Sequence, residues 1–510
     1  MFQCLHQFLD YHARVHGDSP FLVEGKVSLS FADFEARVDR AVDRLRLMSL
    51  SRGDRIALLG KNSINFFTMI LACSKLGVVP VAVNYRLSPS EAAFIIADGT
   101  SQCLLIDAEF IDEVAEHCSG LPVIGLFGSH PAYPDFEQWL GDGEQAVSDS
   151  LPVIAASDIL SQMYTSGTTG MPKGVLLSHA NVIANVYQTA MASEYTFGLG
   201  EQMLLVAPMY HAAGIMTAYT GLIQGLTLII HRDYSPERVV EALSSQPIVA
   251  ATLVPAMLQF ILNHVPDIHR QSFPSLQLIY YGASPMSVDL LKRAIEVFDC
   301  DFAQGYGQTE ANSIVAMLSP SDHRYALASA PDLLSACGRA TFDTRLRLVS
   351  EGKDVEQGEA GEIVASGPQV MQGYWNNPEA TAATIKDGWL YTGDIGRMDK
   401  QGYLYIVGRV KDMIISGGEN IYPAEIETVL ARHQQINEVA VVGIPDARWG
   451  EVPLAVLVGN QSLDSDELRA FCADHLAKFK IPARFEWLGA LPRNPSGKIL
   501  KQQLREQFSN

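Results

Sequence analysis

The sequence has few cysteines, and their spacing argues against two kinds of site. Seven cysteines occur in 510 residues, and no two of them form a Cys-x-x-Cys pair. A scattered, odd-numbered set argues against a disulfide framework and against a zinc knuckle. A chain of this length buries a sufficient core without such a staple. We therefore expect a protein of a reducing compartment, with the cytoplasm as its location.

Basic residues and long apolar runs are also scarce. Lysine and arginine number 37 against 57 acidic residues, so the formal net charge is 37 − 57 = −20. A chain this acidic is a poor general binder of nucleic acid or of anionic membranes. The most apolar span, residues 66–83, is interrupted by Ser74, Lys75 and Pro80. It predicts a buried helix followed by a strand, so we expect neither a nucleic-acid partner nor an integral membrane protein.

Strand-like and helix-like segments alternate through most of the chain. The apolar strands are expected at 55–60, 77–83, 203–208, 226–230, 248–254 and 276–282. With helical segments between them, they predict parallel sheets covered by helices on both faces. Between 338 and 407, short strands separated by glycine predict a small antiparallel barrel or sheet. The mixed pattern then resumes with a helix at 423–433, a strand at 437–443 and a helix near 465–479.

The change of pattern near residue 408 predicts two domains. We expect a large N-terminal domain over residues 1–408, a hinge at 409–412 and a smaller C-terminal domain over 413–510. About 100 residues are enough for a separate hydrophobic core, which favours two domains over one domain with a long tail.

The sharpest motif is the run Tyr164-Thr-Ser-Gly-Thr-Thr-Gly-Met-Pro-Lys-Gly174. Glycines let backbone N–H groups turn inward and hydroxyls add donors, so such a loop can wrap a polyphosphate. The expected phosphate-binding residues are Thr165, Ser166, Gly167, Thr168, Thr169 and Lys173. The run is not a Walker A loop, because Pro172 precedes Lys173 and Gly174 follows it. Ordinary P-loop kinase or GTPase chemistry is therefore disfavoured.

This run resembles the phosphate loop of the adenylate-forming superfamily, which includes acyl-CoA synthetases, amino-acid adenylation domains and luciferases. Four further segments resemble family motifs in the same order: Tyr306–Glu310, Tyr391–Asp394, Gly408–Asp412 with Ile415–Asn420, and Pro492–Lys498. The resemblance covers essentially the whole chain. It implies an α/β fold, with a large N-terminal domain of two doubly wound sheets plus a small β-barrel and a smaller mobile α+β C-terminal domain.

Each motif contributes residues that suit the activation of a carboxylate by ATP. In that reaction two anions must meet, so the site has to neutralise charge on the α-phosphate and on the leaving pyrophosphate. Glu310, with Thr165, suits Mg²⁺ because hard oxygen ligands hold this cation, and Thr309 can donate to the α-phosphate. The expected nucleotide-binding residues besides the loop are Gly282, Ala283, Ser284, Tyr306, Gly307, Thr309, Glu310, Asp394, Arg409 and Lys498. Among them Tyr306 offers a flat face to adenine, and Asp394 can accept from the ribose hydroxyls.

The C-terminal segment is locally basic although the chain is acidic. Residues 478–510 contain seven basic and two acidic side chains, so they carry 7 − 2 = +5. By resemblance, Lys498 reaches between the incoming carboxylate and the α-phosphate during adenylation only. The resemblance also makes Lys411 the hinge residue about which the small domain turns between the two half-reactions. An ordinary surface lysine is the alternative for Lys498.

The second substrates are less well defined by the sequence. His211, Gly282 and Gly305 are the expected acyl-pocket residues, and His211 matches a gate position of the family. Gly417, Gly418, Trp449 and Phe479 match places where some relatives hold CoA, although the two aromatic residues could equally belong to the core. One departure is Ile481, which stands where at least one relative has an arginine that contacts CoA.

The sequence thus predicts an ATP-dependent ligase that converts a fatty or aryl carboxylic acid, through acyl-AMP, into acyl-CoA. ATP, Mg²⁺ and CoA are the expected cofactor and co-substrates. Two alternatives remain: an enzyme that loads a separate carrier protein, and a non-catalytic nucleotide-binding homologue. A Rossmann dehydrogenase is disfavoured because Glu310 stands where the third glycine of Gly-x-Gly-x-x-Gly is required. The identity of the acid and a homodimeric state are left open.

Overall fold

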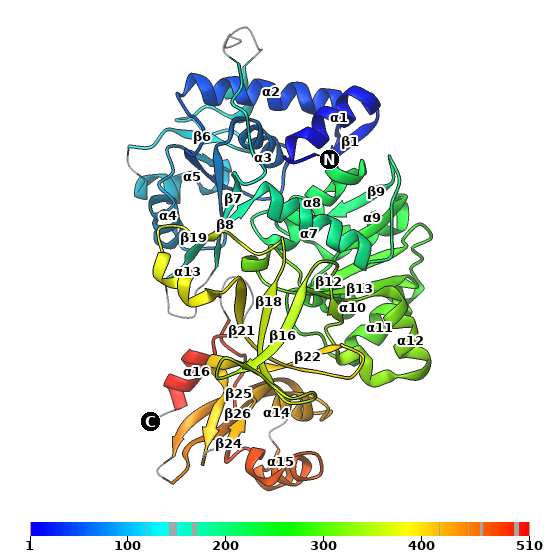
Figure 1. Cartoon of the computed structure of the whole chain (residues 1–510). Helices are drawn as coiled ribbons and strands as arrows, with labels where there is room; N and C mark the ends of the chain where they lie inside the picture. Colours follow the sequence, from blue (N-terminus) through cyan, green and yellow to red (C-terminus); the bar gives the residue numbers. More distant parts are fainter. Residues whose placement is uncertain are drawn as a thin grey trace. The chain divides into compact units, whose positions relative to one another are not determined.

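The computed structural model describes residues 2–118, 120–141, 150–165, 171–417, 419–446, 448–459, 463–493 and 499–508. The chain forms two compact units, which are considered separately (Figure 1). Unit 1 comprises Met1–Leu346 and Ala365–Leu390, and unit 2 comprises Arg347–Val364 and Tyr391–Asn510. All residues from Tyr391 onward therefore belong to unit 2, and this boundary precedes the hinge that the sequence predicts at 409–412. That hinge stays a prediction.

Unit 1 contains a sheet of nine strands, in the order β15-β14-β13-β12-β11-β9-β10-β1-β2. The strands are β1 (Pro20–Glu24), β2 (Val27–Ser30), β9 (Gln202–Leu205), β10 (Thr227–Ile230), β11 (Ile248–Thr252), β12 (Leu278–Gly282), β13 (Asp301–Tyr306), β14 (Ala316–Leu318) and β15 (Arg339–Ala340). The run from β13 to β1 is parallel, and antiparallel strands stand at both edges. The prediction of parallel strands near 203, 226, 248 and 276 is confirmed.

The second sheet of unit 1 has seven strands, in the order β19-β8-β7-β4-β3-β5-β6. Its strands are β3 (Arg55–Leu59), β4 (Val79–Val83), β5 (Leu104–Ile106), β6 (Val123–Gly125), β7 (Ile159–Thr165), β8 (Lys173–Ser178) and β19 (Gly373–Tyr374). The short β19, drawn in yellow, comes from far along the chain and pairs antiparallel with β8 (Figure 1). The apolar span 66–83 forms most of α3 (Ile64–Leu76) and all of β4, as predicted.

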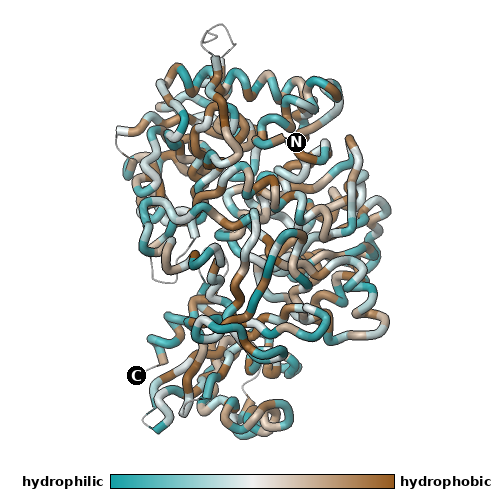
Figure 2. The backbone as a smooth tube through the Cα atoms, in the orientation of Figure 1, coloured by the Kyte–Doolittle hydropathy of each residue, from teal (hydrophilic) through white to brown (hydrophobic). Residues whose placement is uncertain are grey.

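Helices cover these sheets; α2 (Phe31–Leu47) buries one face, whereas α3 is buried along nearly its whole surface. In α2, Phe34, Val38 and Leu45 are fully buried, and Ser30 caps the first turn. Hydrophilic and hydrophobic residues alternate along this helix in Figure 2. The other helices of unit 1 are α1 (His6–His16), α4 (Pro89–Asp98), α5 (Ala108–Val114), α6 (Phe136–Leu140), α7 (His179–Ala192), α8 (Ala212–Gln224), α9 (Pro236–Ser245), α10 (Pro255–His264), α11 (Val288–Phe298), α12 (Pro320–Ser329) and α13 (Pro378–Thr384). Among the described residues, no helix combines the length and the apolarity that a membrane crossing needs.

Strands also dominate unit 2. A six-stranded sheet runs β17-β16-β18-β21-β20, and β22 pairs with β21; a five-stranded sheet runs β24-β23-β26-β25, and β27 pairs with β26. The strands are β16 (Arg345–Ser350), β17 (Lys353–Asp354), β18 (Gly361–Ser366), β20 (Ile385–Lys386), β21 (Trp389–Met398), β22 (Leu404–Arg409), β23 (Ile414–Ser416), β24 (Glu419–Ile421), β25 (Ile436–Asp446), β26 (Gly450–Gly459) and β27 (Arg484–Trp487). The boundary between the two units falls within β16, β18 and β21, and β20 belongs to unit 1.

The helices of unit 2 are α14 (Pro423–Leu430), α15 (Ser465–Ala473) and α16 (Lys501–Phe508). The prediction of one helix near 465–479 is wrong at its C-terminal end, because α15 ends at Ala473. Leu468 and Cys472 fill the core from this helix, and a turn then returns Leu476 to the same cluster. A short 3₁₀ turn, Lys478–Lys480, follows and leaves Phe479 exposed.

Candidate functional site

The backbones of β12 and β13 lie close together at the ends of these strands, where both carry glycine. Gly282 lies opposite Gly305 in the parallel register, and a Cβ on Gly282 would stand 2.3 Å from the Gly305 carbonyl oxygen. Ala283 follows with a positive φ of 64°, and Ala283 and Ser284 are exposed. Carboxyl ends of parallel strands are where open α/β sheets bind ligands. The structure thus brings three predicted nucleotide-binding residues, together with Gly305, to the carboxyl ends of these two neighbouring strands.

The segment after β13 turns tightly. A Cβ on Gly307 would lie 2.2 Å from the Ser313 carbonyl oxygen, so only glycine fits there. Tyr306 is half-buried against a small cluster that includes Ala311 and Leu390. The next residues form the 3₁₀ turn Thr309–Ala311, which buries Glu310. This turn explains how an acidic residue four positions after the end of β13 comes to be buried.

Predicted phosphate and metal residues gather around the Glu310 carboxylate. The Tyr374 hydroxyl donates to Glu310 Oε1 at 2.8 Å, and the Thr165 hydroxyl donates to the same oxygen at 3.4 Å. The Lys173 ammonium lies 5.1 Å from the centre of the Tyr374 ring. Burial and the neighbouring carboxylate raise the pKa of Tyr374, so its phenol keeps its proton at neutral pH. The sequence motifs do not include Tyr374; the signal available was the triplet Gly373-Tyr374-Trp375.

The donor set at Glu310 fits Mg²⁺. Among the described residues, no group of three or more His, Cys, Asp or Glu side chains is arranged to hold a metal ion. Mg²⁺ does not need such a cage, because it is commonly held by one or two carboxylates together with waters and substrate phosphates. A buried carboxylate with a hydroxyl beside it, at the foot of a predicted phosphate loop, meets this requirement.

The predicted phosphate loop is carried by a rigid hairpin. Thr165 and Lys173 stand opposite each other in the antiparallel pair of β7 and β8. Below them the Tyr164 hydroxyl donates to the Asp98 carboxylate, and Gln162 Nε2 donates to the Tyr164 oxygen at 3.1 Å. Burial and Asp98 raise the pKa of Tyr164. The loop residues Ser166, Gly167, Thr168 and Thr169 lie outside the described residues.

A second layer joins this hairpin to the segment that holds Tyr374. Arg55 Nε donates to Gln162 Oε1 at 3.0 Å, and its guanidinium stands 3.3 Å from the centre of the Trp375 ring. The Trp375 indole donates to the Asp98 carbonyl oxygen at 2.9 Å, and its backbone N–H donates to the Gly174 carbonyl oxygen at 2.7 Å. Residues 374 and 375 therefore connect the carboxylate of the turn with the base of the loop.

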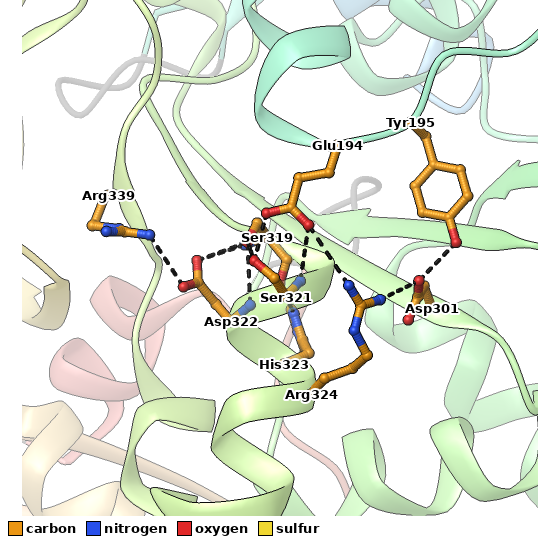
Figure 3. Close-up of polar contacts among 9 residues, drawn as sticks. All are labelled: Glu194, Tyr195, Asp301, Ser319, Ser321, Asp322, His323, Arg324 and Arg339. Carbon is orange, nitrogen blue, oxygen red and sulfur yellow. Dashed lines mark hydrogen bonds and ion pairs between the residues drawn. The ribbon is translucent and has the colours of Figure 1, made fainter.

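A polar network supports β13 on the side of α12 (Figure 3). The Tyr195 hydroxyl donates to Asp301 Oδ2 at 2.7 Å, and Arg324 pairs with the same carboxylate. Burial raises the pKa of Tyr195 to about 12. Asp301 is the first residue of β13, whereas Tyr306 ends it. The network thus anchors the strand at the end opposite to the predicted nucleotide residues.

His211 stands at the N-cap position of a helix, after a strand-to-helix turn. It precedes α8, and its ring lies 4.4 Å from the ring of Tyr210. Gly214 permits this turn, because a Cβ there would lie 2.2 Å from the Pro208 carbonyl oxygen. Arg86 donates to the Tyr210 hydroxyl at 3.3 Å. An acyl pocket made by His211 with Gly282 and Gly305 stays a prediction.

In unit 2 two of the predicted nucleotide-binding residues, Asp394 and Arg409, form an ion pair. Asp394 on β21 lies opposite Arg409 on β22, and Arg409 Nε stands 2.9 Å from Asp394 Oδ1. The carboxylate is buried, whereas the arginine side chain is 45% exposed. Arg409 therefore holds Asp394 in one orientation. Lys411 follows in the 3₁₀ turn Val410–Asp412 and is exposed.

Two predicted CoA residues contact each other, and the aromatic ones are exposed. The Gly417 backbone N–H donates to the Trp449 carbonyl oxygen at 2.8 Å, and a Cβ on Gly417 would lie 2.7 Å from the indole. Trp449 and Phe479 are 47% and 43% exposed, so the alternative that they are core residues is wrong. Gly418 and Lys498 lie outside the described residues.

Comparison with known protein families finds two matching family models. The model of the AMP-binding enzyme matches residues 9–375, and that of the AMP-binding enzyme C-terminal domain matches residues 425–498. Both matched ranges contain motifs considered above, because Glu310 lies in the first range and Trp449 in the second.

Similar proteins match along nearly their whole length. The fatty acid–[acyl-carrier-protein] ligase ScoC of Streptomyces coeruleorubidus is 36% identical over 99% of this chain and 96% of its own. A feruloyl-CoA synthase of an Amycolatopsis species is 36% identical over 97% of each chain. Among solved structures, the o-succinylbenzoate CoA synthetase MenE of Bacillus subtilis, in complex with ATP and magnesium, has a TM-score of 0.86, 31% identity and 98% coverage of each chain. The same enzyme in complex with its acyl-adenylate intermediate has a TM-score of 0.85, 32% identity, and coverage of 98% of this chain and 97% of its own.

Proposed function

The chain belongs to the AMP-binding enzyme family, and we propose that it is an ATP-dependent acid:CoA ligase. In the first step a carboxylate oxygen attacks the α-phosphate of ATP, and the bond to pyrophosphate breaks. In the second step the sulfur of CoA attacks the acyl carbon, the bond to AMP breaks and the thiol loses its proton. The convergence of Glu310, Thr165 and Lys173 at the base of the loop is the observation that carries this proposal.

The first step requires that two anions approach each other. Glu310, with Thr165, would hold Mg²⁺, which when bound lowers the charge on phosphate oxygens and thereby favours the attack. Lys173 and the loop 165–169 would bind the phosphates, and Thr309 would donate to the α-phosphate. Lys498 would neutralise the charge that develops between carboxylate and phosphate.

The nucleoside would be recognised by the remaining predicted residues. Gly282 ends β12, and the exposed residues Ala283 and Ser284 follow it, so the edge of a base can approach the chain there. Tyr306, at the end of β13, and Gly307, directly after it, would also contact the nucleoside. Asp394, held by Arg409, would accept from the ribose hydroxyls, because an ionised carboxylate is an acceptor only.

The second step requires a different arrangement of the same chain. A rotation about Lys411 would carry Lys498 away from the nucleotide and open a path for the thiol. Gly417, Gly418, Trp449 and Phe479 would then hold CoA. The exposed indole of Trp449 supports this assignment, since exposed aromatic faces suit the stacking of a base.

The acid is proposed to be fatty or aryl, with His211, Gly282 and Gly305 at the acyl pocket. Relatives named for a fatty acid and for an aryl acid are equally similar to this chain. ScoC is named for a carrier protein as acceptor, so a separate carrier protein is the second candidate acceptor. All seven cysteines are thiols, six of them buried, which supports the cytoplasm as location.

A screen of pyrophosphate release tests this proposal. Purified protein is incubated with ATP, Mg²⁺ and a panel of fatty, aryl, short branched and amino acids, with CoA, with a holo-carrier protein or with neither. Acid-dependent release together with a CoA thioester is the expected result. If a thioester forms on the carrier protein and not on CoA, the carrier protein is the acceptor. Binding of ATP without any acid-dependent release would favour the non-catalytic alternative.

A further inference from the structure

One residue that hydrogen-bonds to Glu310 belongs to none of the motifs in the sequence. Tyr374 lies on the two-residue strand β19, 64 positions after Glu310, and its hydroxyl donates to Glu310 Oε1 at 2.8 Å. Both side chains are 9% exposed. We propose that Tyr374 is a positioning residue for the metal ligand: it occupies Oε1 of Glu310 and leaves Oε2 as the oxygen offered to Mg²⁺. This inference rests on the proposed function.

The two hydrogen bonds on Oε1 define how the carboxylate can act. A carboxylate oxygen accepts through two lone pairs, and the hydroxyls of Tyr374 and Thr165 both point to Oε1. Mg²⁺ demands near-ideal octahedral geometry at about 2.0–2.1 Å. A carboxylate that offers a single, fixed oxygen meets this demand better than one that can rotate or bind through both oxygens. Tyr374 therefore restricts Glu310 to one mode of coordination.

The backbone around Tyr374 holds its ring in place. Tyr374 pairs with Val175 of β8, and its N–H donates to Thr381 Oγ1 at 2.9 Å. The next residue, Trp375, is fixed by its two hydrogen bonds and by Arg55. Because β8 begins at Lys173, the segment that orients the carboxylate is also attached to the hairpin of the phosphate loop. One rigid unit thus sets the distance between the metal ligand and the phosphate loop.

A purely structural role would be to satisfy a buried carboxylate. The two roles differ in what they do to metal binding. If Tyr374 only stabilises the fold, its loss lowers the melting temperature and leaves the Mg²⁺ dependence of ATP binding unchanged. If it orients the ligand, its loss weakens Mg²⁺ binding, because residues that hold a metal ligand typically change metal affinity by about 10–100-fold.

The test compares Tyr374→Phe with Tyr195→Phe. Both substitutions remove one phenol–carboxylate hydrogen bond, and the bond of Tyr195, to Asp301 at 2.7 Å, lies at the opposite end of β13 (Figure 3). ATP affinity is measured by calorimetry, without any acid, over a series of Mg²⁺ concentrations. For Tyr374→Phe the half-saturating Mg²⁺ concentration should rise roughly 10-fold or more. In Tyr195→Phe the half-saturating Mg²⁺ concentration should change less than about twofold. The ATP affinity measured without Mg²⁺ should also change less than about twofold.

If Tyr374→Phe lowers the stability of the protein, a double-mutant cycle with Glu310→Gln still tests the proposal. In a Glu310→Gln background the ligand is already impaired, so Tyr374→Phe should add less than about twofold. Additive effects of the two substitutions would overturn the inference, and so would an unchanged Mg²⁺ dependence in Tyr374→Phe or the absence of any Mg²⁺ dependence in the wild type. Wild-type protein that binds ATP with Mg²⁺ but activates no acid would overturn the proposed function and leave the role of Tyr374 standing.

Discussion

Asp107 provides a quantitative test of how the two sheets of unit 1 are joined. It follows β5 of the seven-stranded sheet, and its Oδ2 accepts from Arg232, which follows β10 of the nine-stranded sheet, at 2.7 Å. The Lys61 backbone N–H donates to the same oxygen at 2.9 Å. Oδ1 is buried and has no hydrogen-bond partner among the residues that the structure describes. Burial raises the pKa of Asp107 from 3.8 to about 6, although Arg232 acts in the opposite direction.

The raised pKa of Asp107 fixes the sign of its contribution to stability. Between pH 4 and 6 the folded protein holds a proton that the unfolded chain has released, so the free energy of unfolding falls as the pH rises. From 3.8 and 6, the loss is (6 − 3.8) × 1.36, or about 3 kcal/mol, complete above about pH 7. Asp107→Asn removes this titration. The variant should therefore gain stability relative to wild type as the pH rises from 4.5 to 7.5.

Melting temperatures of the two proteins, measured side by side, test this expectation. Of this loss, (6 − 4.5) × 1.36, or about 2 kcal/mol, falls between pH 4.5 and 7.5. At about 2 °C per kcal/mol for a large domain, the difference should change by roughly 4 °C over this range. Asp18→Asn is the control, because Asp18 is exposed on unit 1. A difference between Asp107→Asn and wild type that stays constant over this pH range would refute the assignment of a proton to the folded state.

Three further predictions concern the proposed reaction. Lys498→Ala should lose acid-dependent pyrophosphate exchange by roughly 100-fold or more and keep thioester formation from synthetic acyl-AMP; an equal loss in both assays would contradict the assigned role. Lys411→Pro should slow thioester formation and spare exchange, because proline fixes the hinge dihedral; normal CoA turnover would remove the argument. Trp449→Ala should raise the KM for CoA by roughly 5-fold or more, as expected when a stacking partner of about 1–3 kcal/mol is lost, and an unchanged KM would exclude Trp449 from the CoA site.

Several of the predicted site residues lie at or near strand ends in the structure. Thr165 and Lys173 flank a loop between two strands, and Glu310 follows a strand, so motif and local structure indicate the same place. Tyr374 carries no such signal. Its strand has two residues and no periodicity, and its partner is 64 positions away. The pairing of β19 with β8, together with the Met371 N–H that donates to the Glu310 carbonyl oxygen at 2.9 Å, brings the two together.

The helix predicted near 465–479 shows why the pattern of apolar residues failed at one point. Leu468, Cys472 and Leu476 have helical spacing, and all three do pack into one cluster. The chain reaches that cluster by a helix that ends at Ala473 and then by a turn. Periodicity identifies which residues are buried, whereas the length of the helix is decided by the space that the core leaves for it.

The charges of the described site give a reason for a moving cation. In unit 1 the groups that converge at the base of the loop include one cation, Lys173, and one carboxylate, Glu310, so their formal charges cancel. ATP and a carboxylate together bring several negative charges to the same place. Mg²⁺ on Glu310 and a lysine from the basic segment 478–510 would supply the missing positive charge for adenylation. After pyrophosphate leaves, less negative charge remains, and the same positive charge would only bind AMP more tightly. A lysine that can be withdrawn therefore serves both steps better than a fixed one, which is the physical case for placing it beyond a hinge.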